Sequence, residues 1–334
     1  MAPTDQTLLE PAASALEPFA GLSPAARDRL MAMGPVWNED ISRHRQIVME
    51  TYGPVARLHK DGIAAARDLA YGPHERHRLD VFRPAAPGPR PVVLFIHGGA
   101  FTRGRKSMDG EIYDNVLYWF ARQGFVGVNV EYRLAPEIAY PAGAIDVADA
   151  VAWVVSNIAD FGGNPDEILL IGHSAGGTHV GTYLLDPRLG RAPAPAIKGA
   201  VFLSSRLRAD AHPENPNAKN VKAYFGEDQA TFEERSPMTY AARCRWPVFI
   251  ATAEHENRFL DVYGAEFFFK LAAARGRAPR FCQLSHHNHT SIVAHFNTGE
   301  ERLGRTILDF FVRDCGLGRW HDSARTVRSD REEA

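Results

Sequence analysis

The sequence predicts an α/β fold, with a mostly parallel central sheet and helices on both faces. Short apolar runs rich in Val, Ile, Leu and Phe alternate along most of the chain with longer amphipathic segments. Near-continuous apolar strands are typical of a parallel sheet that is covered on both sides. The chain has 334 residues, 45% of them hydrophobic, which is enough to bury a full core. The steady alternation favours one large domain over two small ones.

The elements of this domain are expected from residue 78 onward. Short apolar runs bounded by Pro, Gly or polar residues predict strands, and apolar residues recurring at helical spacing predict helices. The first two strands, for instance, are separated by a Pro/Gly-rich turn at 83–89. The predicted strands cover residues 78–82, 92–96, 125–130, 168–171, 197–203, 248–252 and 280–284. The predicted helices cover residues 112–123, 142–158, 178–185, 263–274 and 300–312.

The stretch 171–177 reads Ile-Gly-His-Ser-Ala-Gly-Gly and directly follows an apolar run. A buried strand that meets Gly-x-Ser-x-Gly and continues as a helix has the layout of a nucleophile elbow, with Ser174 as the candidate nucleophile. A serine held at such a strained turn leaves no room for side chains two residues away on either side. Gly172 and Gly176 satisfy this requirement. The helix begins at Ala175, whose amide can therefore stabilise negative charge.

A second glycine motif stands upstream, where residues 95–101 read Phe-Ile-His-Gly-Gly-Ala-Phe at the end of another apolar strand. A Gly-x-Ser-x-Gly match alone is weak evidence, because ordinary turns are also rich in glycine and serine. The His-Gly-Gly sequence is typical of an oxyanion loop, and it comes in the expected order. Gly98, Gly99 and Ala175 are therefore predicted to supply the amides of an oxyanion hole. His97 is expected to orient this loop.

A serine nucleophile needs a general base, and His289 is the predicted one. In this arrangement the chain order is Ser, acid, His, with the acid and the His on loops after the last two strands. His289 follows the last predicted strand, where it would take the proton from Ser174 and return it to the leaving group. His286 and His287 lie nearer the strand end and are interpreted as solvated loop histidines. His295, in a helix-like segment, is interpreted as structural.

The acid is predicted to be Glu256, in the loop that follows the strand 248–252. Glu254 lies at the strand end, where a local ion pair or cap would also explain it, and Asp261 could begin the next helix. These two carboxylates remain the alternatives. A Glu can replace the commoner Asp, because the role is to fix the imidazole tautomer and to stabilise the imidazolium.

Residues 1–70 show helical rather than strand periodicity and are expected to form an N-terminal helical cap over the active site. A peripheral extension packed on the sheet edge is the alternative. Residues 71–315 are assigned to the catalytic domain, and the charged, aperiodic residues 316–334 to a loosely held tail. The polar loop 209–217 begins either a second cap element or a long surface excursion.

Composition and charge limit the partners and cofactors. The net charge of −2 gives no reason to expect nucleic acid or an anionic membrane as a partner. The three cysteines lack metal-ligand spacing, and their odd number fits a reducing compartment. The N-terminus lacks the pattern of a signal peptide, and no segment approaches membrane-spanning length. We therefore expect a soluble cytoplasmic protein that acts on a small molecule without a cofactor or metal. Whether it forms a homodimer is left open.

With both motifs in place, the sequence resembles the hormone-sensitive-lipase-like esterases of the α/β-hydrolase superfamily, including their kynurenine-formamidase-like relatives. The resemblance covers roughly residues 79–312. It includes Tyr-Arg-Leu-Ala-Pro-Glu at 132–137 and Phe-Gly-Gly-Asn-Pro-Asp at 161–166. It implies the α/β-hydrolase fold and a Ser-His-acid triad, with Glu256 at the position of the acid. It also implies a structural pair, Arg133 with Asp146, that braces the sheet near the site.

The sequence departs from the family pattern at two points. The common His-Gly-Gly-Gly loop here has Ala100 in its last position, which keeps an N–H but has less backbone freedom. The residue before the nucleophile, often Asp in the lipase-like branch, is His173. This spelling and the ending 289–293 both look more like the formamidase-like branch.

The sequence therefore predicts a serine hydrolase, a carboxylesterase that cleaves small esters with short-to-medium acyl chains through an acyl-enzyme. An arylformamidase or another amidase that uses the same triad is the alternative among enzymes. A catalytically inactive, ligand-binding protein of hydrolase fold is the alternative of another class. The complete set of Ser174, His289 and a carboxylate argues against that last alternative.

Overall fold

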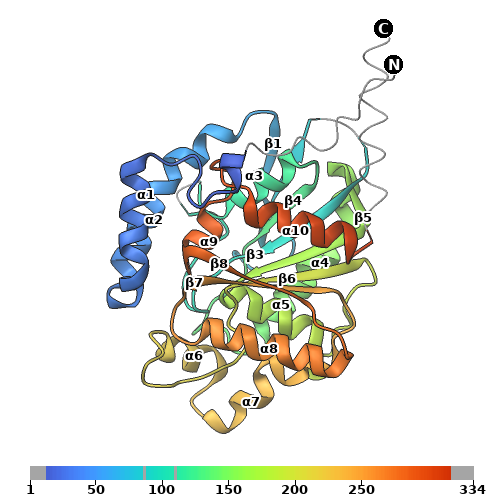
Figure 1. Cartoon of the computed structure of the whole chain (residues 1–334). Helices are drawn as coiled ribbons and strands as arrows, with labels where there is room; N and C mark the ends of the chain where they lie inside the picture. Colours follow the sequence, from blue (N-terminus) through green and yellow to red (C-terminus); the bar gives the residue numbers. More distant parts are fainter. Residues whose placement is uncertain (1–12, 86–87, 109–110, 317–334) are drawn as a thin grey trace.

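The computed structural model describes residues 13–85, 88–108 and 111–316, and this part of the chain is built on an eight-stranded sheet (Figure 1). The spatial order of the strands is β1-β2-β4-β3-β5-β6-β7-β8. Strands β3 to β8 pair in parallel with one another, while β1 and β2 are antiparallel to their neighbours. The strands are β1 (Ile63–Ala70), β2 (Arg78–Pro84), β3 (Arg90–Ile96), β4 (Val126–Val130), β5 (Gly163–His173), β6 (Ile197–Leu203), β7 (Val248–His255) and β8 (Arg280–Asn288).

Helices cover both faces of this sheet. Helices α3 and α10 lie on one face, and α4, α5 and α8 lie on the other (Figure 1). Helices α1 and α2 stand together at one end of the molecule, and α6 and α7 lie in the long connection between β6 and β7. The helices are α1 (Pro24–Met33), α2 (Ile41–Ala56), α3 (Asp114–Arg122), α4 (Ala142–Asn157), α5 (Ala175–Leu185), α6 (Ala218–Phe225), α7 (Phe232–Arg235), α8 (Leu260–Arg275), α9 (Ser291–Ala294) and α10 (Arg302–Arg313).

The core has two layers because successive side chains of a strand point to opposite faces of the sheet. On β3, Val93 and Phe95 pack among residues of α3 and α10, while Val92 and Leu94 pack among residues of α4 and α5. Residues 92–96 are fully buried. The near-continuous apolar run that predicted a doubly covered strand thus fills both layers at once.

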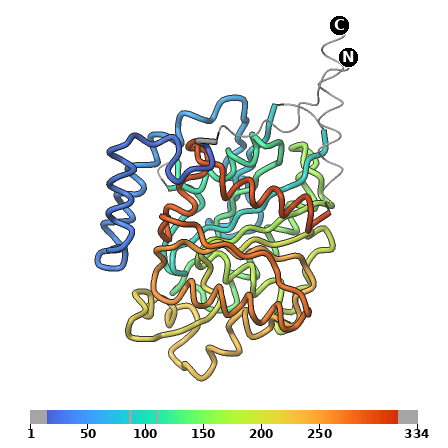
Figure 2. Tube along the Cα trace, in the orientation of Figure 1, coloured from blue at the N-terminus to red at the C-terminus, as the bar shows by residue number. Residues whose placement is uncertain are grey.

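The N-terminal segment is bound to the chain that follows β8. The Phe19 amide donates to Glu300 Oε2 at 2.7 Å, and the Glu301 amide donates to the Ala15 carbonyl at 2.8 Å. Further along, Trp37 Nε1 donates to Asn257 Oδ1 at 2.8 Å. Figure 2 shows the blue start of the described chain running against the orange-red segment near residue 300. These contacts hold the N-terminal helices beside the ends of β7 and β8.

The predicted strands and helices are confirmed, with β5, β7 and β8 extending further than expected. The expectation of helix throughout residues 1–70 is wrong for 63–70, which form β1 and pair with β2. Half of this edge strand is alanine, its two faces are both partly exposed, and a bulge interrupts it between Ala66 and Leu69. No alternating pattern was therefore present to reveal it. The predicted tail lies outside the described residues from 317 onward.

Helix α4 and the short helical turn after it, Ala142–Phe161, are long and apolar enough by composition to cross a membrane. Half of that segment is buried, and it packs against α5 and β5. This is the setting expected of a core helix in an α/β sheet.

Glu300 is expected to make stability sensitive to acid. Its burial raises the pKa, but the neighbouring His287 and His295 rings and the bond from the Phe19 amide outweigh this and lower the pKa to about 2. Because the folded-state pKa is depressed, the stabilisation is complete above about pH 4.5 and is lost as the pH falls through about 2. Glu300→Gln should lower the free energy of unfolding at pH 7 by about 2–3 kcal/mol. Denaturant unfolding at several pH values measures this.

The matched control is Glu301→Gln, because Glu301 makes a half-exposed ion pair with Arg305. Such a pair contributes less than about 1 kcal/mol. The difference between wild type and Glu300→Gln should shrink as the pH is lowered from 5 toward 2. A difference that stays constant over this range would contradict the assignment of Glu300.

Candidate active site

The turn between β5 and α5 holds Ser174 in a strained conformation. Ser174 has φ +53° and ψ −120°, a region that residues with a side chain rarely occupy. A Cβ on Gly172 would lie 2.5 Å from Gly177 Cα, and a Cβ on Gly176 would overlap the carbonyl oxygen of Ile96. The two glycines are therefore required by close backbone packing, as the sequence predicted.

The predicted serine, histidine and acid come together at the carboxyl ends of the strands. Ser174 Oγ lies 3.0 Å from His289 Nε2, and His289 Nδ1 lies 2.7 Å from Glu256 Oε2. The second oxygen, Glu256 Oε1, accepts a hydrogen bond of 2.9 Å from the Ala253 amide. His289 and Glu256 are buried, and Ser174 is partly accessible. The acid is thus fixed by two contacts, and the serine can be reached from the cavity.

The other carboxylates that were considered face elsewhere. Glu254 Oε2 accepts a hydrogen bond of 2.6 Å from the His286 amide, and Asp261 lies in the first turn of α8, where it lines an outer groove. Neither has a hydrogen bond to His289 in the described structure. Glu256 is therefore the carboxylate that orients the histidine.

The other histidines are also accounted for. His286 is exposed, but the interpretation as a solvated loop histidine is wrong for His287, which is fully buried because β8 extends to Asn288. His287 Nε2 lies 3.0 Å from Glu300 Oε1. His295 Nδ1 lies 2.9 Å from the Ser291 carbonyl, and burial lowers the pKa of His295 to about 4. These roles are local and structural. Of the candidate histidines, only His289 reaches the Ser174 hydroxyl.

The loop after β3 brings its backbone beside Ser174. Gly99 and Ala100 line the same cavity as the serine, while Gly98 does not. Gly98 instead lies behind the nucleophile, where a Cβ would be 3.0 Å from Ser174 Cβ and 3.1 Å from the Tyr113 hydroxyl. The sequence predicts the amides of Gly98 and Gly99 for an oxyanion hole; of these two residues Gly99 lines the cavity, and Ala100 lines it beside Gly99. Ala100 adopts φ +49°, a left-handed conformation that glycine would adopt at lower cost.

Ala175 is the first residue of α5, so its amide has no acceptor within the helix. The amide follows the nucleophile directly and stands at the positive end of the helix dipole. It is therefore free of a helical acceptor and available for the anion-stabilising role that the sequence predicts.

His97 holds the oxyanion-type loop, as expected. Its Nδ1 lies 2.6 Å from the Gly98 carbonyl and its Nε2 lies 3.1 Å from Glu131 Oε1. The ring stacks on Tyr132, with 4.3 Å between ring centroids, and the Tyr132 hydroxyl donates to the His97 carbonyl at 2.9 Å. His97 has no contact with the serine hydroxyl in the described structure and so acts as a support for the loop.

The predicted structural pair is present as well. Arg133 Nη2 lies 2.6 Å from Asp146 Oδ1, and the Arg133 amide donates to Asp146 Oδ2 at 2.9 Å. Asp146 is fully buried at the start of α4. The pair ties α4 to the segment that carries Tyr132 and thereby supports the loop under the site.

His173 was seen in the sequence only as a marker of the family branch, but the structure gives it a positioning role. Its Nδ1 lies 3.2 Å from the Tyr113 hydroxyl and its Nε2 lies 3.0 Å from the His289 carbonyl. Burial, and then the neighbouring His289, hold the pKa of His173 well below its usual value, so the ring is neutral. A neutral ring that accepts from Tyr113 and donates to the His289 carbonyl satisfies both contacts. The sequence signal for this positioning role was that His173 directly precedes Ser174.

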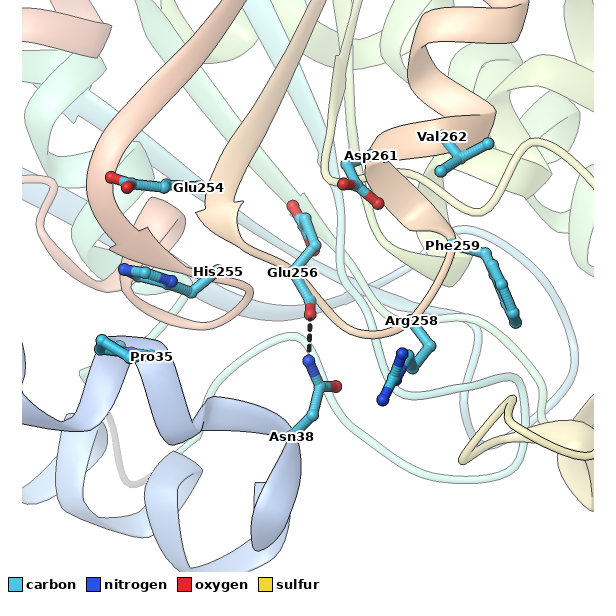
Figure 3. Close-up of a pocket in the computed structure, with 10 residues that line it drawn as sticks. Pro35, Asn38, Glu254, His255, Glu256, Arg258, Phe259, Asp261 and Val262 are labelled. Carbon is cyan, nitrogen blue, oxygen red and sulfur yellow. Dashed lines mark hydrogen bonds between the residues drawn. The ribbon is translucent and has the colours of Figure 1, made fainter.

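The N-terminal segment supports the acid from outside. Asn38 Nδ2 donates to the Glu256 carbonyl at 2.9 Å, as Figure 3 shows, with the Glu256 side chain pointing away from Asn38. This contact borders an outer groove of about 370 Å³ behind the acid. The next residue, Asn257, is held by Trp37, as described above. The loop carrying the acid is thus fixed by two side chains that precede α2.

A cavity of about 410 Å³ opens on Ser174 and His289. Its walls come from parts that are far apart in the sequence: α2, the loop after β3, the turn before α3, the loop before α6, and the ends of β5 and β8. Helix α2 supplies Ile41, Ser42 and Arg45, so the N-terminal segment does form part of the wall. Among the residues that the structure describes, no group of three or more His, Cys, Asp or Glu side chains could hold a metal ion.

Known proteins with similar sequences include esterases and ester hydrolases. The family model described as BD-FAE matches residues 79–183. Esterase LipQ of Mycobacterium tuberculosis is 26% identical over 259 residues, covering 71% of this chain and 59% of LipQ. The probable carboxylic ester hydrolase LipM of the same organism is 28% identical over 267 residues, covering 71% of this chain and 58% of LipM. The chain thus spans less than two thirds of these relatives' length.

Solved structures agree on the fold. The esterase of Pyrobaculum calidifontis superposes with a TM-score of 0.66 at 22% identity, covering 89% of this chain and 99% of that one. A bacterial heroin esterase superposes with a TM-score of 0.62 at 24% identity, covering 88% of this chain and 98% of that one. Taken together, these structural similarities show that the chain has the α/β-hydrolase fold, and its sequence is similar to that of the esterases named above.

Proposed function

We propose that this protein is a carboxylesterase that cleaves small esters by covalent catalysis at Ser174. The observation that carries the proposal is the continuous line of contacts from Glu256 through His289 to Ser174, ending in an accessible cavity. This arrangement of acid, base and nucleophile is the one that activates a serine hydroxyl. The relatives whose printed names describe esterases and ester hydrolases support the same reaction class.

In the proposed acylation step, Ser174 Oγ attacks the carbonyl carbon of the ester while its proton passes to His289 Nε2. Glu256 accepts the hydrogen bond from His289 Nδ1 and balances the positive charge that forms on the ring. The C–O bond to the leaving alcohol then breaks, and the same proton moves from His289 to the alcohol oxygen. The acyl group remains on Ser174.

In the proposed deacylation step, water replaces the alcohol. His289 takes a proton from the water as its oxygen attacks the acyl carbon, and returns it to Ser174 Oγ as the carboxylic acid leaves. The negative oxygen of both tetrahedral intermediates would be bound by the amides of Gly99, Ala100 and Ala175. Such amides stabilise charge without reorganising during the reaction.

The cavity supports small substrates with short-to-medium acyl chains. Its volume of about 410 Å³ is at the small end of ligand sites in proteins. An arylformamidase or another amidase is the second candidate, favoured by His173 before the nucleophile, a feature that also resembles the formamidase-like branch. Both candidates use the same three residues.

Ester and formamide substrates separate these two candidates. We expect turnover of 4-nitrophenyl acetate or butyrate to exceed that of N-formylkynurenine, because the relatives named above are esterases and ester hydrolases. Steady-state kcat/KM for each substrate measures this. Strong cleavage of the formamide with negligible cleavage of both esters would reject the carboxylesterase and favour the amidase.

Ser174→Ala should lower kcat for the ester by a factor of about 10⁴ or more, because the mutant has no nucleophile to acylate. The wild type should be labelled by a fluorophosphonate probe, which reacts with activated serines, and Ser174→Ala should not be. Ser156→Ala, on the exposed face of α4, is the control and should behave as the wild type. Absence of labelling in both proteins would favour a ligand-binding protein without catalysis.

Glu256→Gln should lower kcat by a factor of about 10² to 10⁴, because an amide cannot balance the imidazolium or hold the correct tautomer. Glu254→Gln is the matched control, two residues away in the same segment, and should stay within severalfold of wild type because Glu254 contacts the His286 amide. Measuring kcat for 4-nitrophenyl butyrate compares them. A larger loss in Glu254→Gln than in Glu256→Gln would show that Glu254, and not Glu256, is the catalytic acid.

A further inference from the structure

Two arginines, Arg45 and Arg103, line the cavity that holds Ser174 and His289. Arg45 comes from α2 and is half-buried, while Arg103 lies on the loop after β3 and is exposed. Among the described residues that line this cavity, none is an Asp or a Glu. Glu256, the described acid that reaches the catalytic residues, is already bonded to His289. The wall facing the substrate therefore carries positive charge.

Neither guanidinium has an ion pair in the described part of the chain. Arg45 Nη2 lies 2.8 Å from Met108 Sδ, and Arg103 Nη2 donates to Asn217 Oδ1 at 3.2 Å. A thioether and a side-chain amide are neutral acceptors, so these contacts position the side chains without balancing their charges. By contrast, Arg57, directly after the end of α2, pairs with Glu111. A surface arginine near the cavity thus has a carboxylate partner, whereas the described residues of the cavity wall include no carboxylate.

The two charges act on the same space. Burial lowers the pKa of Arg103, and the positive charge of Arg45 lowers it further. Arg45 also opposes the rise in the pKa of Tyr113 that burial causes, and Tyr113 lines the cavity beside Ser174. Like charges near a partly desolvated cavity repel each other unless an anion lies between them. The cavity is therefore prepared for a negatively charged group.

The chemistry of arginine narrows the kind of anion. Its planar fork of N–H donors matches a carboxylate and binds it with charge-assisted hydrogen bonds. The oxyanion of the reaction does not need this charge, because the amides of the loop after β3 and of α5 are already placed for it. A carboxylate elsewhere on the substrate would occupy the donors that remain.

We propose that Arg45 and Arg103 select esters or amides that carry a carboxylate on the acyl chain or on the leaving group. This inference rests on the proposed hydrolysis at Ser174 and names its substrate class. The carboxylate lies between the guanidinium groups while the scissile carbonyl lies at the serine. The pair acts in substrate recognition and takes no part in bond breaking.

Two matched series of esters test the selection. In the first, the leaving group carries the charge: 4-acetoxybenzoate is compared with neutral 4-acetoxybenzamide and cationic 4-acetoxyphenyl-trimethylammonium. In the second, the acyl chain carries it: the mono-4-nitrophenyl ester of adipic acid is compared with the same ester bearing a terminal primary amide. Each kcat/KM is divided by the rate of hydroxide hydrolysis of the same ester. In at least one series, the anion should be preferred by a factor of about 10 to 100, expressed mainly in KM.

Variants assign the preference to the two side chains. Arg45→Gln and Arg103→Gln should each reduce it by about tenfold. Both variants should leave kcat/KM for the neutral esters within about threefold, which also reports on folding. Arg45→Lys keeps the charge and should keep most of the preference. The controls are Arg43→Gln and Arg105→Gln, two exposed arginines that lie two residues away and do not line the cavity; these should behave as wild type.

Added salt gives a test on the wild type alone, because it screens exposed and half-exposed charges. Raising the salt concentration should lower kcat/KM for the anionic ester and leave that of the neutral ester nearly unchanged. If neutral esters are cleaved as well as anionic ones in both series, the inference fails while the proposed function stands. A preference that persists in both Gln variants would also overturn it.

If no ester in either series is cleaved, the proposed function fails, and calorimetric titration of the Ser174→Ala protein with benzoate tests the arginines separately. Saturable binding that weakens on Arg45→Gln would keep them as a carboxylate site. No binding of benzoate would overturn the inference as well.

Discussion

The close packing of α5 against the end of β3 is the constraint on which the rest of the site depends. Because Gly176 has no side chain, the backbone of α5 can pack against the Ile96 carbonyl. Because Gly172 has none, the end of β5 can pack against the backbone of Gly177. The positive φ of Ser174 costs on the order of 1–3 kcal/mol. Hydrogen bonds from the Ser174 amide to the Leu203 carbonyl and from the Arg206 amide to the Ser174 carbonyl oppose this cost. The turn between β5 and α5 is thus held by hydrogen bonds to the end of the neighbouring strand β6 and to the residues that follow it.

Parallel pairing then brings the remaining groups to the same edge. The carboxyl ends of β3, β5, β7 and β8 all lie on one side of the sheet, because these strands run in the same direction. They deliver, in order, the loop that carries Gly99, the nucleophile, Glu256 and His289. The shared direction of four strands is therefore enough to assemble chain segments that are more than one hundred residues apart, such as Ser174 and His289.

The sequence predicted those parts of the molecule that depend on local pattern. Apolar runs located the buried strands. The Gly-x-Ser-x-Gly motif located Ser174, because the turn requires glycine at positions that are close to the serine in the sequence. His289 followed from chain order. The edge strand β1 was missed, because Ala, Arg and Asp with two half-exposed faces give no alternation. The choice of Glu256 over Glu254 depended on where β7 ends.

Backbone angles and distant segments could not be predicted in the same way. Whether Gly98 or Ala100 faces the cavity depends on the φ values of a loop, +143° at Gly99 and +49° at Ala100, and these are not encoded by composition. The cavity wall also contains Arg45, from a helix that precedes the domain. Its distance from Ser174 is set by tertiary contacts such as that of Trp37 with Asn257. Neither arginine belongs to a motif.

The charges around His289 connect the proposed chemistry with substrate choice. A carboxylate at position 173, common in the lipase-like branch, would add negative charge beside the base; here His173 is buried and neutral and adds none. In the proposed mechanism, a positive ring forms when His289 receives the proton from Ser174, in a cavity that already contains Arg45 and Arg103 and with Glu256 as its only described carboxylate partner. A substrate that brings its own carboxylate supplies the missing negative charge. The negative charge of this substrate also lowers the positive potential of the cavity before the imidazolium forms.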